Sequence, residues 1–214
     1  AIFSYNIWVI LSPVLASMSA LILFYYLTRN YFAAFIGGYM YGFSSYELGQ
    51  LLGHLNLFGG TFIIPVLLLI SILLYQDKRN KILYMLIYSF LLILLFGFSL
   101  EIFTSLTLFS YISVLIAFLI LKEERKAIFR LGKYLTISYI ITSIILVPYF
   151  YFLYLGLPFI EVFNDPSIFS ADLLNYIIPT PITLIGGSYF EKLASRFSGN
   201  FSEEGAYIGL PLLL

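Results

Sequence analysis

Residues 82–121 read ILYMLIYSFLLILLFGFSLEIFTSLTLFSYISVLIAFLIL. This stretch contains two apolar runs of about 20 residues, each long enough to cross a hydrocarbon layer roughly 30 Å thick as a helix. Glu101 is its only charged residue, and almost no sequence separates the two runs. We therefore expect two membrane-spanning helices, at about 82–99 and 102–121, that form a helical hairpin.

The same apolar pattern recurs on both sides of this hairpin. The chain is 61% hydrophobic and only 10% charged, with a mean hydropathy of +0.99, which no ordinary soluble domain reaches. The sequence therefore predicts an all-α, polytopic transmembrane helix bundle with about six complete spans and the start of a seventh. Besides the hairpin, we expect spans at about 5–28, 31–46, 55–75 and 134–155, and a further one from about 206.

The chain divides into three predicted parts: a helix bundle over 1–155, an extracytoplasmic polar segment over 156–205, and the start of another span over 206–214. Because residue 1 is Ala and the last residues open an apolar run, we expect the chain to be an internal fragment. A short surface helix is expected in the polar segment, with aromatic and aliphatic residues on one side and polar ones on the other. Its apolar residues are Tyr189, Phe190, Leu193 and Phe197, and its polar residues are Glu191, Lys192, Ser195 and Arg196. Asn200-Phe201-Ser202 is an N-glycosylation sequon in the same segment.

The predicted span at 31–46 has a row of small residues. Ala34, Gly38 and Gly42 recur at every fourth position, which places them on one helical face. Small residues in this pattern let a second helix approach closely within a membrane. We expect this span to be buried in the bundle.

The basic residues predict an orientation. Nine of the eleven lie in alternate connections, at Arg29, 78–81 and 122–133, whereas eight of the eleven acidic residues fall on the other side. Because Lys and Arg collect in short cytoplasmic loops, we expect those three connections to be cytoplasmic. The composition is compatible with a prokaryotic plasma membrane, including an archaeal one. Zero net charge argues against nucleic acid as a partner, and the absence of Cys excludes disulfides and thiolate metal sites.

The stretch 41–65 holds the most concentrated polar chemistry in the chain. Glu47, Gln50 and the only histidine, His54, stand at i, i+3 and i+7, so a continuous helix would place all three along one face. Asn56 follows closely. The plainer interpretation is that Glu47 and His54 lie at the membrane interface and that Glu101 is a solvated residue at a hairpin tip. The pattern E-x-x-Q-x-x-x-H is not a metal signature by itself.

Several short motifs together resemble one membrane-protein superfamily. They are Asn6, Tyr26-Leu27-Thr28-Arg29, Ala33-Ala34-Phe35-Ile36-Gly37-Gly38, Phe43-Ser44-Ser45-Tyr46, Gly53-His54-Leu55-Asn56-Leu57, Tyr176-Ile177-Ile178-Pro179-Thr180-Pro181 and Tyr207-Ile208-Gly209-Leu210-Pro211. In this order they are similar to polytopic proteins of the GT-C glycosyltransferase superfamily. The resemblance implies an integral membrane enzyme that transfers a sugar from a polyprenyl-phosphate carrier to an acceptor on the extracytoplasmic side.

The chemistry of such a sugar transfer, which needs a carboxylate to take the acceptor proton and cationic help for the leaving phosphate, suggests roles for the polar residues. Glu47 and Glu101 are the candidate catalytic acids, and Gln50, His54 and Asn56 are candidates for substrate binding. Glu47 and His54 are also candidate ligands of a divalent metal, Mg²⁺ or Mn²⁺, since both cations accept carboxylate oxygens and imidazole can join them. The superfamily places its key acid in a loop that would precede Ala1, so we expect this chain alone to be inactive.

A transporter or flippase of a lipid-linked sugar or a small solute is the alternative function. Transporters often have interrupted helices around a midplane site, and Pro13, Pro65 and Pro148 allow such interruptions. Against this alternative, the spans show no internal repeat, and the polar residues gather at one side of the bundle. The sequence does not indicate an oligomeric state.

Overall fold

The structure is a computed structural model that describes residues 2–51, 54–77, 79–156, 167–168, 170–183, 187–199 and 204–208, with Ser45 described by its backbone alone. These residues form helices and no strand, which confirms the predicted all-α class. The chain separates into two compact units, Ala1–Leu155 and Gly156–Leu214.

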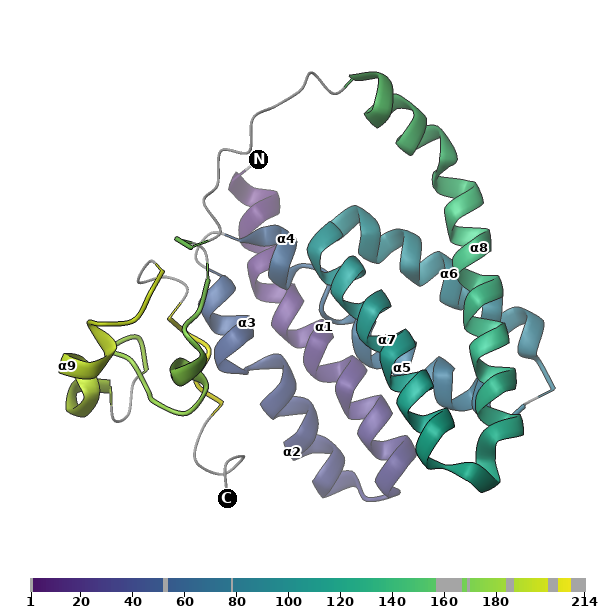
Figure 1. Ribbon diagram of the computed structural model, residues 1–214, viewed down its shortest axis with the longest axis horizontal. Helices are drawn as coiled ribbons and strands as arrows, with labels where there is room; N and C mark the ends of the chain where they lie inside the picture. Colours follow the sequence, from purple (N-terminus) through teal and green to yellow (C-terminus); the bar gives the residue numbers. More distant parts are fainter. Residues whose placement is uncertain are drawn as a thin grey trace. The chain divides into compact units, whose positions relative to one another are not determined.

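The first unit is a bundle of helices of very different lengths (Figure 1). Five of its segments are long and apolar enough to cross a membrane: Ile2–Thr28, Leu55–Tyr75, Lys81–Phe98, Leu100–Ile120 and Lys122–Gly156. Its helices are α1 (Ile2–Thr28), α2 (Tyr31–Gly42), α3 (Ser45–Gln50), α4 (Leu55–Phe58), α5 (Ile63–Tyr75), α6 (Lys81–Phe98), α7 (Leu100–Ile120), the 3₁₀ turn η1 (Lys122–Glu124) and α8 (Arg125–Gly156).

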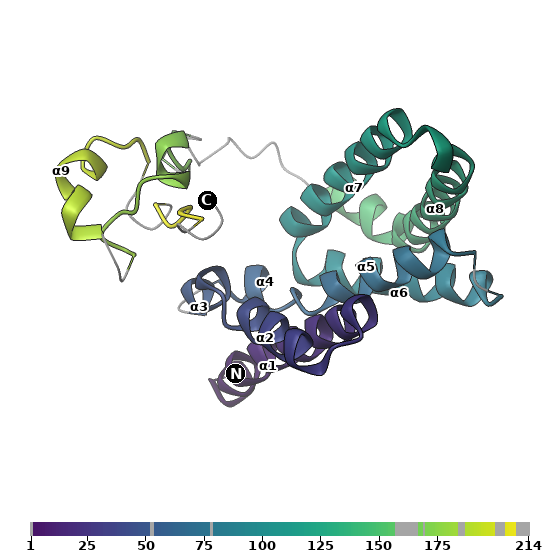
Figure 2. The ribbon, with the colours of Figure 1, turned by 90° about the horizontal axis from the view of Figure 1, so that it is seen from below.

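The predicted hairpin is confirmed. Only Ser99 separates α6 from α7, and its side-chain oxygen accepts a hydrogen bond from the backbone N–H of Ile102, 3.2 Å away. This bond satisfies one of the donors that a helix leaves unpaired at its start. A second hairpin follows, because α7 and α8 also run side by side (Figure 2), with the Tyr111 and Thr136 hydroxyls 3.2 Å apart.

Two predicted boundaries are wrong. The helix that starts at Tyr31 ends at Gly42 after 12 residues, about 18 Å, which is too short to cross the hydrocarbon layer. Ser44 then caps a separate helix, because its hydroxyl accepts a hydrogen bond from the Glu47 N–H. The predicted loop at 122–133 is mostly helical, since α8 already begins at Arg125. The predicted seventh span lies largely outside the described residues, and 204–208 has no regular structure.

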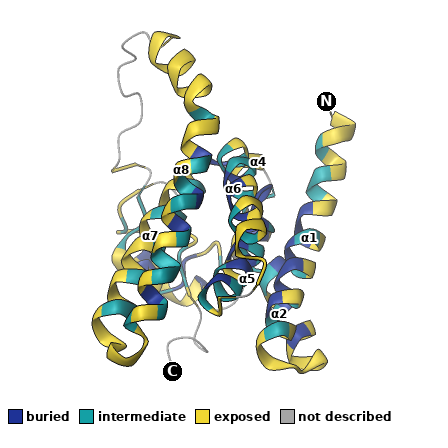
Figure 3. Ribbon diagram, turned by 90° about the vertical axis from the view of Figure 1, so that its right-hand side faces the viewer, coloured by how far each residue is buried: buried dark blue, intermediate teal, exposed yellow. Residues whose placement is uncertain are grey.

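The small residues of α2 pack against α1, as their spacing predicted, but the expectation that this helix is buried in the bundle is wrong, because its other face, with Phe32 and Met40, is exposed. Ala34, Gly38 and Gly42 are its buried residues, and Figure 3 shows buried positions on both helices where they run side by side. A Cβ atom at Gly38 would lie 2.7 Å from the Ser17 carbonyl oxygen, and one at Gly42 would collide with Ser17 and with the Pro13 carbonyl oxygen. Only glycine allows this backbone approach.

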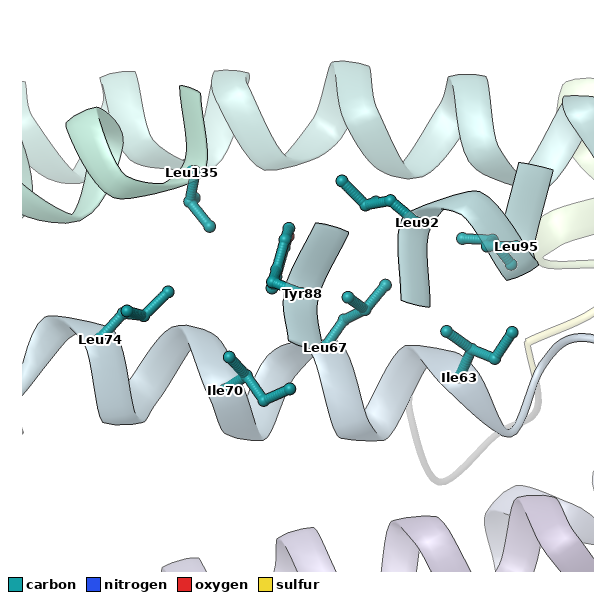
Figure 4. Packing of buried hydrophobic residues seen from close by; sticks show 8 residues of the cluster. All are labelled: Ile63, Leu67, Ile70, Leu74, Tyr88, Leu92, Leu95 and Leu135. Carbon is teal, nitrogen blue, oxygen red and sulfur yellow. The ribbon is translucent and has the colours of Figure 1, made fainter. Parts of the chain in front are cut away.

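The main apolar core lies between α5, α6 and α8 (Figure 4). It is formed by Ile63, Leu67, Ile70 and Leu74 of α5, by Tyr88, Leu92 and Leu95 of α6, and by Leu135 of α8. The α5 residues recur at intervals of three and four, so they form one stripe along that helix. This core holds the central hairpin against the neighbouring spans.

Hydroxyl groups join α6 to α8 beside this core. Ser89 donates to the carbonyl oxygen of Ser138 across 3.0 Å, and Ser138 donates to that of Met85 across 3.2 Å. The Thr142 hydroxyl lies 3.2 Å from the Ser89 carbonyl oxygen of α6. It also lies 2.9 Å from the carbonyl oxygen of Ser138, four residues earlier in α8. Small hydroxyl residues of this kind stabilise helix contacts in apolar surroundings, where few other polar partners exist.

The three basic connections meet at one end of the bundle, here called the basic end. The Tyr26 hydroxyl at the end of α1 donates to the Gln76 side chain across 2.7 Å. The Tyr75 hydroxyl donates to Glu124 across 2.9 Å, which brings η1 to the same turn. The basic connections, which alternate with the others along the sequence, are therefore gathered at one end of the bundle.

The second unit contains three short helical segments, η2 (Leu173–Tyr176), η3 (Gly187–Phe190) and α9 (Glu191–Ala194). The buried side chain of Asn175 accepts a hydrogen bond from the Ala206 N–H, and Thr180 donates to the Glu204 carbonyl oxygen. The predicted surface helix is thus a short 3₁₀ turn followed by one α-helical turn. Tyr189 on it is 91% exposed.

Candidate functional site

The candidate site lies at the end of the first unit opposite the basic end, here called the polar end. Four side chains fasten the polar stretch of the sequence to its neighbours by donating to backbone carbonyl oxygens. Tyr5 donates to Leu51 across 3.0 Å, Ser12 to Phe58 across 2.8 Å, Tyr41 to Thr61 across 2.9 Å and Tyr46 to Leu57 across 3.4 Å. These bonds draw the starts of α1 and α3 and the end of α2 around α4.

Two adjacent glycines make the turn between α4 and α5 possible. A Cβ at Gly59 would lie 2.8 Å from the Trp8 indole nitrogen, and one at Gly60 would lie 2.9 Å from the Phe98 Cβ. The Trp8 and Phe98 rings stack at 5.5 Å between centroids with 11° between their planes, and Phe62 meets both edge-on. The polar end is therefore built on a rigid aromatic cluster.

A groove of about 980 Å³ opens beside this cluster. Most of its lining is apolar or aromatic, with a few hydroxyl and amide groups among it. The lining residues are Ile2, Ser4, Tyr5, Trp8, Leu55, Asn56, Gly97 and Phe98. Small-molecule sites in proteins commonly combine an apolar lining with a few polar groups, as this groove does.

Glu47 is the most unusual charged residue of the polar end. It is only 2% exposed, and no described residue donates a hydrogen bond to its Oε2. Burial raises the pKa of its carboxyl group to about 7, and hydrogen bonding with the Thr61 side chain opposes this shift. Glu47 lies on α3, outside the five candidate spans. A carboxyl group with this pKa can exchange a proton near neutral pH.

Glu101 lies within electrostatic range of the same region. Burial raises the pKa of the Tyr46 hydroxyl, and the negative charges of Glu47 and Glu101 both add to that shift. Glu101 itself is exposed in the first turn of α7, where a negative charge is favoured by the helix dipole. Its position therefore fits a helix-stabilising role as well as a chemical one.

The predicted alignment of Glu47, Gln50 and His54 on one helical face is wrong. Helix α3 ends at Gln50, and His54 has φ −113° and ψ 64° as the residue that precedes α4. Gln50 is half-buried, whereas His54 and Asn56 are exposed. Of these predicted site residues, only Asn56 lines the groove.

The described residues offer little support for a resident metal. Nowhere in the described part of the chain do three Asp, Glu, His or Cys side chains come together. Because the helix breaks between Glu47 and His54, the spacing that suggested these two ligands no longer brings them together. Binding of Mg²⁺ or Mn²⁺ stays a prediction.

Sequence reasoning missed Tyr5, Trp8, Thr61 and Phe98. Trp8 is the only tryptophan of the chain, and Gly59-Gly60 is one of its adjacent glycine pairs, so both were visible signals. Their role in the site depends on a tertiary contact, in which α1 and the end of α6 meet the turn after α4. No local sequence pattern reveals that contact. The predicted glycosylation residue, Asn200, lies outside the described residues.

Comparison of the chain with protein-family models, with curated proteins and with solved structures finds no match.

Proposed function

We propose that this chain is part of an integral membrane glycosyltransferase that moves a sugar from a polyprenyl-phosphate donor to an acceptor hydroxyl at the polar end. The observation that carries the proposal is the buried carboxyl group of Glu47, whose pKa is raised and whose Oε2 has no hydrogen-bond partner among the described residues. The acceptor oxygen bonds to the anomeric carbon while the bond from that carbon to the phosphate oxygen breaks. The acceptor proton passes to Glu47, which takes the role that the resemblance alone would give to an acid preceding Ala1, and the phosphate leaves with the bonding electrons.

The pKa of Glu47 supports its role as the base. A general base works best when its pKa is close to the working pH, because about half of it is then deprotonated and the deprotonated form is still basic enough to accept a proton. An ordinary glutamate, with a pKa near 4.3, is a much weaker base. Burial of Glu47 therefore supplies the property that the reaction needs.

The groove supports a donor with an isoprenoid tail. Trp8, Phe98 and Leu55 offer apolar surface, and Asn56 and Tyr5 offer polar groups in the same lining. In this proposal the tail lies along the aromatic surface, and Asn56 and Gln50 contact sugar hydroxyls. Glu101 contributes a second negative charge beside Tyr46, and His54 approaches the donor phosphate.

The separation of charge supports an extracytoplasmic site. Arg79, Lys81, Lys126 and Lys133 belong to the basic end, and the positive-inside tendency assigns such an end to the cytoplasm. The polar end, with Glu47 and the groove, then opens on the opposite side of the plasma membrane. Donor sugars carried by polyprenyl phosphate would be used there.

The test is a sugar-transfer assay on the full-length protein in membranes, supplied with a labelled polyprenyl-phosphate sugar. We expect Glu47→Gln to lower transfer by at least 100-fold at equal protein level, because general-base catalysis typically contributes factors of 10² to 10⁴. Glu123→Gln, an exposed acid at the basic end, is the matched control and should keep full activity. Full activity of the Glu47 variant would overturn the role of Glu47.

The same assay separates the enzyme from the alternative, a transporter or flippase. A flippase would move the labelled lipid across the membrane without forming a new glycosidic bond. Wild-type membranes that translocate the donor but make no transferred product would therefore replace the proposed enzyme with a transporter.

A further inference from the structure

Helix α8 is longer than a membrane crossing requires. Its 32 residues extend about 48 Å, whereas the hydrocarbon core of a bilayer is about 30 Å thick. The residues from Lys133 to Gly156 alone would cover about 36 Å. Because the basic residues of α8 all lie from Arg125 to Lys133, we assign this extra length to its first turns, which project into the headgroup layer at the basic end.

The outward face of these turns has a regular composition. Lys126, Phe129 and Lys133 recur at intervals of three and four, which places them in one stripe, and Lys122 of η1 precedes Lys126 by four residues. All four are exposed, Phe129 by 70%. The buried positions of α8, which include Ile128, Leu135, Ser138 and Thr142, lie on the opposite face of the helix. We call the four outward residues the lysine stripe.

The lysine stripe continues into the lipid-facing surface of the same helix. At the same intervals the outward face continues with Ile140, Ile144 and Val147, which are 52%, 64% and 57% exposed. Side chains on this face thus change from lysine to aliphatic between Lys133 and Ile140. This change marks the level at which headgroups give way to hydrocarbon.

The other charged groups of this segment point to different partners. Arg125 donates from its Nε to the Phe118 carbonyl oxygen at the end of α7, and Arg130 donates to the Tyr75 carbonyl oxygen and pairs with Asp77. Glu124 accepts the Tyr75 hydroxyl on the bundle side. Glu123 of η1 is exposed. The outward stripe itself consists of lysines and one aromatic residue.

We propose that the lysine stripe binds the phosphate headgroups of anionic phospholipids in the leaflet at the basic end. Three ammonium groups complement the negative headgroups, and long lysine side chains can reach them while their methylene groups stay along the helix. Phe129, between Lys126 and Lys133, enters the boundary between headgroups and acyl chains. The stripe anchors the start of α8 at a fixed depth in the bilayer.

Native mass spectrometry of the purified full-length protein, incubated with an equimolar mixture of phosphatidylglycerol and phosphatidylcholine, tests this proposal. We expect preferential retention of phosphatidylglycerol, weakened by salt. Replacing Lys122, Lys126 and Lys133 by Gln should reduce that preference by about fivefold for each lysine removed at low salt. The triple Lys→Arg variant should keep the preference, and so should Lys192→Gln combined with Arg196→Gln, which removes the two basic residues of the second unit.

Equal retention of the two lipids by the wild type, or an unchanged preference in a folded triple Gln variant, would overturn the proposal. Equal retention would favour a soluble protein partner for the stripe instead. If the triple Gln variant does not fold, the wild-type preference and its salt dependence, with the Arg variant as reference, still decide the question.

Discussion

Tyr134 donates its hydroxyl hydrogen to Oδ1 of Asp77 across 3.0 Å and so joins α8 to the turn between α5 and α6. Lys81 Nζ lies 3.6 Å from the same oxygen, and Arg130 Nε lies 3.8 Å from Oδ2. One exposed carboxylate thus collects groups from α6 and α8. The basic end of the bundle is organised around this residue.

Replacing Asp77 by Asn should destabilise the basic end. Asn keeps the shape of the side chain and tolerates the left-handed backbone of this residue, φ 51°, but it removes the charge that faces Lys81 and Arg130. We expect a lower midpoint in thermal unfolding of the protein in detergent. Glu123→Gln is the control, because it removes one negative charge from the same end without touching this network.

The contribution of the Asp77 network to stability should also depend on pH. The hydrogen bond from Tyr134 and the nearby Arg130 and Lys81 lower the pKa of Asp77 below its usual value. A lowered folded-state pKa contributes stability above the unfolded-state value, near 3.9, and that contribution is lost as the pH falls through the folded-state pKa. Thermal midpoints of wild type and Asp77→Asn should therefore converge below about pH 4. A constant difference down to pH 2 would contradict this reading.

The contact between α6 and α8 can be tested with a matched pair of threonines. Thr142 and Thr104 each contact the carbonyl oxygen four residues earlier, but only Thr142 also contacts another helix, at Ser89. Thr142→Val should destabilise the bundle by about 0.5–1.5 kcal/mol, the range of interhelical hydrogen bonds in membranes. Thr104→Val should be nearly neutral. Equal effects in reversible unfolding would mean that the bond across the helices contributes nothing.

A pair of glycines tests the packing of α2 on α1. At Gly38 an added methyl group meets the Ser17 carbonyl oxygen at 2.7 Å, whereas at Gly49 it meets nothing within 4 Å. Gly38→Ala should therefore cost about 1–3 kcal/mol, as overpacking usually does. Gly49→Ala should be neutral or stabilise by up to about 1 kcal/mol, because Ala favours helix. Unfolding in graded denaturing detergent measures both, and a neutral Gly38 variant would show that the two helices are further apart.

Glu47 should make stability depend on pH in the opposite sense to Asp77. Its folded-state pKa of about 7 is above the unfolded value near 4.3, so its contribution is full below that lower value and declines as the pH rises through 7. Glu47→Gln should remove this decline. At pH 8 the variant should be more stable than wild type by about 1–2 kcal/mol, allowing for screening by nearby solvent. A variant that keeps the wild-type pH profile would show that the carboxyl group is not buried.

The sequence predicted most of the helices, because crossing a hydrocarbon layer requires runs of about 20 apolar residues that are easy to recognise. The hairpin at Ser99 and the small face of α2 follow directly from such local patterns. The length of α2 could not be predicted from such a pattern, because Phe43 and Tyr46 continue the apolar run after the helix has ended at Gly42. Only the cap at Ser44 marks that end.

The candidate site was less predictable than the fold. Glu47 stood out as an acid in an apolar chain, but its grouping with Gln50 and His54 assumed one continuous helix. Helix α3 instead ends at Gln50, and a separate helix, α4, begins at Leu55. Burial of Glu47 beside Thr61 is a tertiary effect, because it depends on where the turn after α4 meets α2 and α3. The same is true of Trp8, which becomes part of the groove only when α1 reaches Phe98.

In the proposed topology, the basic end and the polar end lie on opposite sides of a membrane. Because the chain contains no cysteine, single cysteines can be introduced at the exposed positions Arg79 and Lys126 of the basic end and at Asn56 and Glu101 of the polar end. An impermeant thiol reagent applied to intact cells should label positions 56 and 101, and should reach 79 and 126 only after the cells are opened. Labelling of all four positions from the same side would contradict the account.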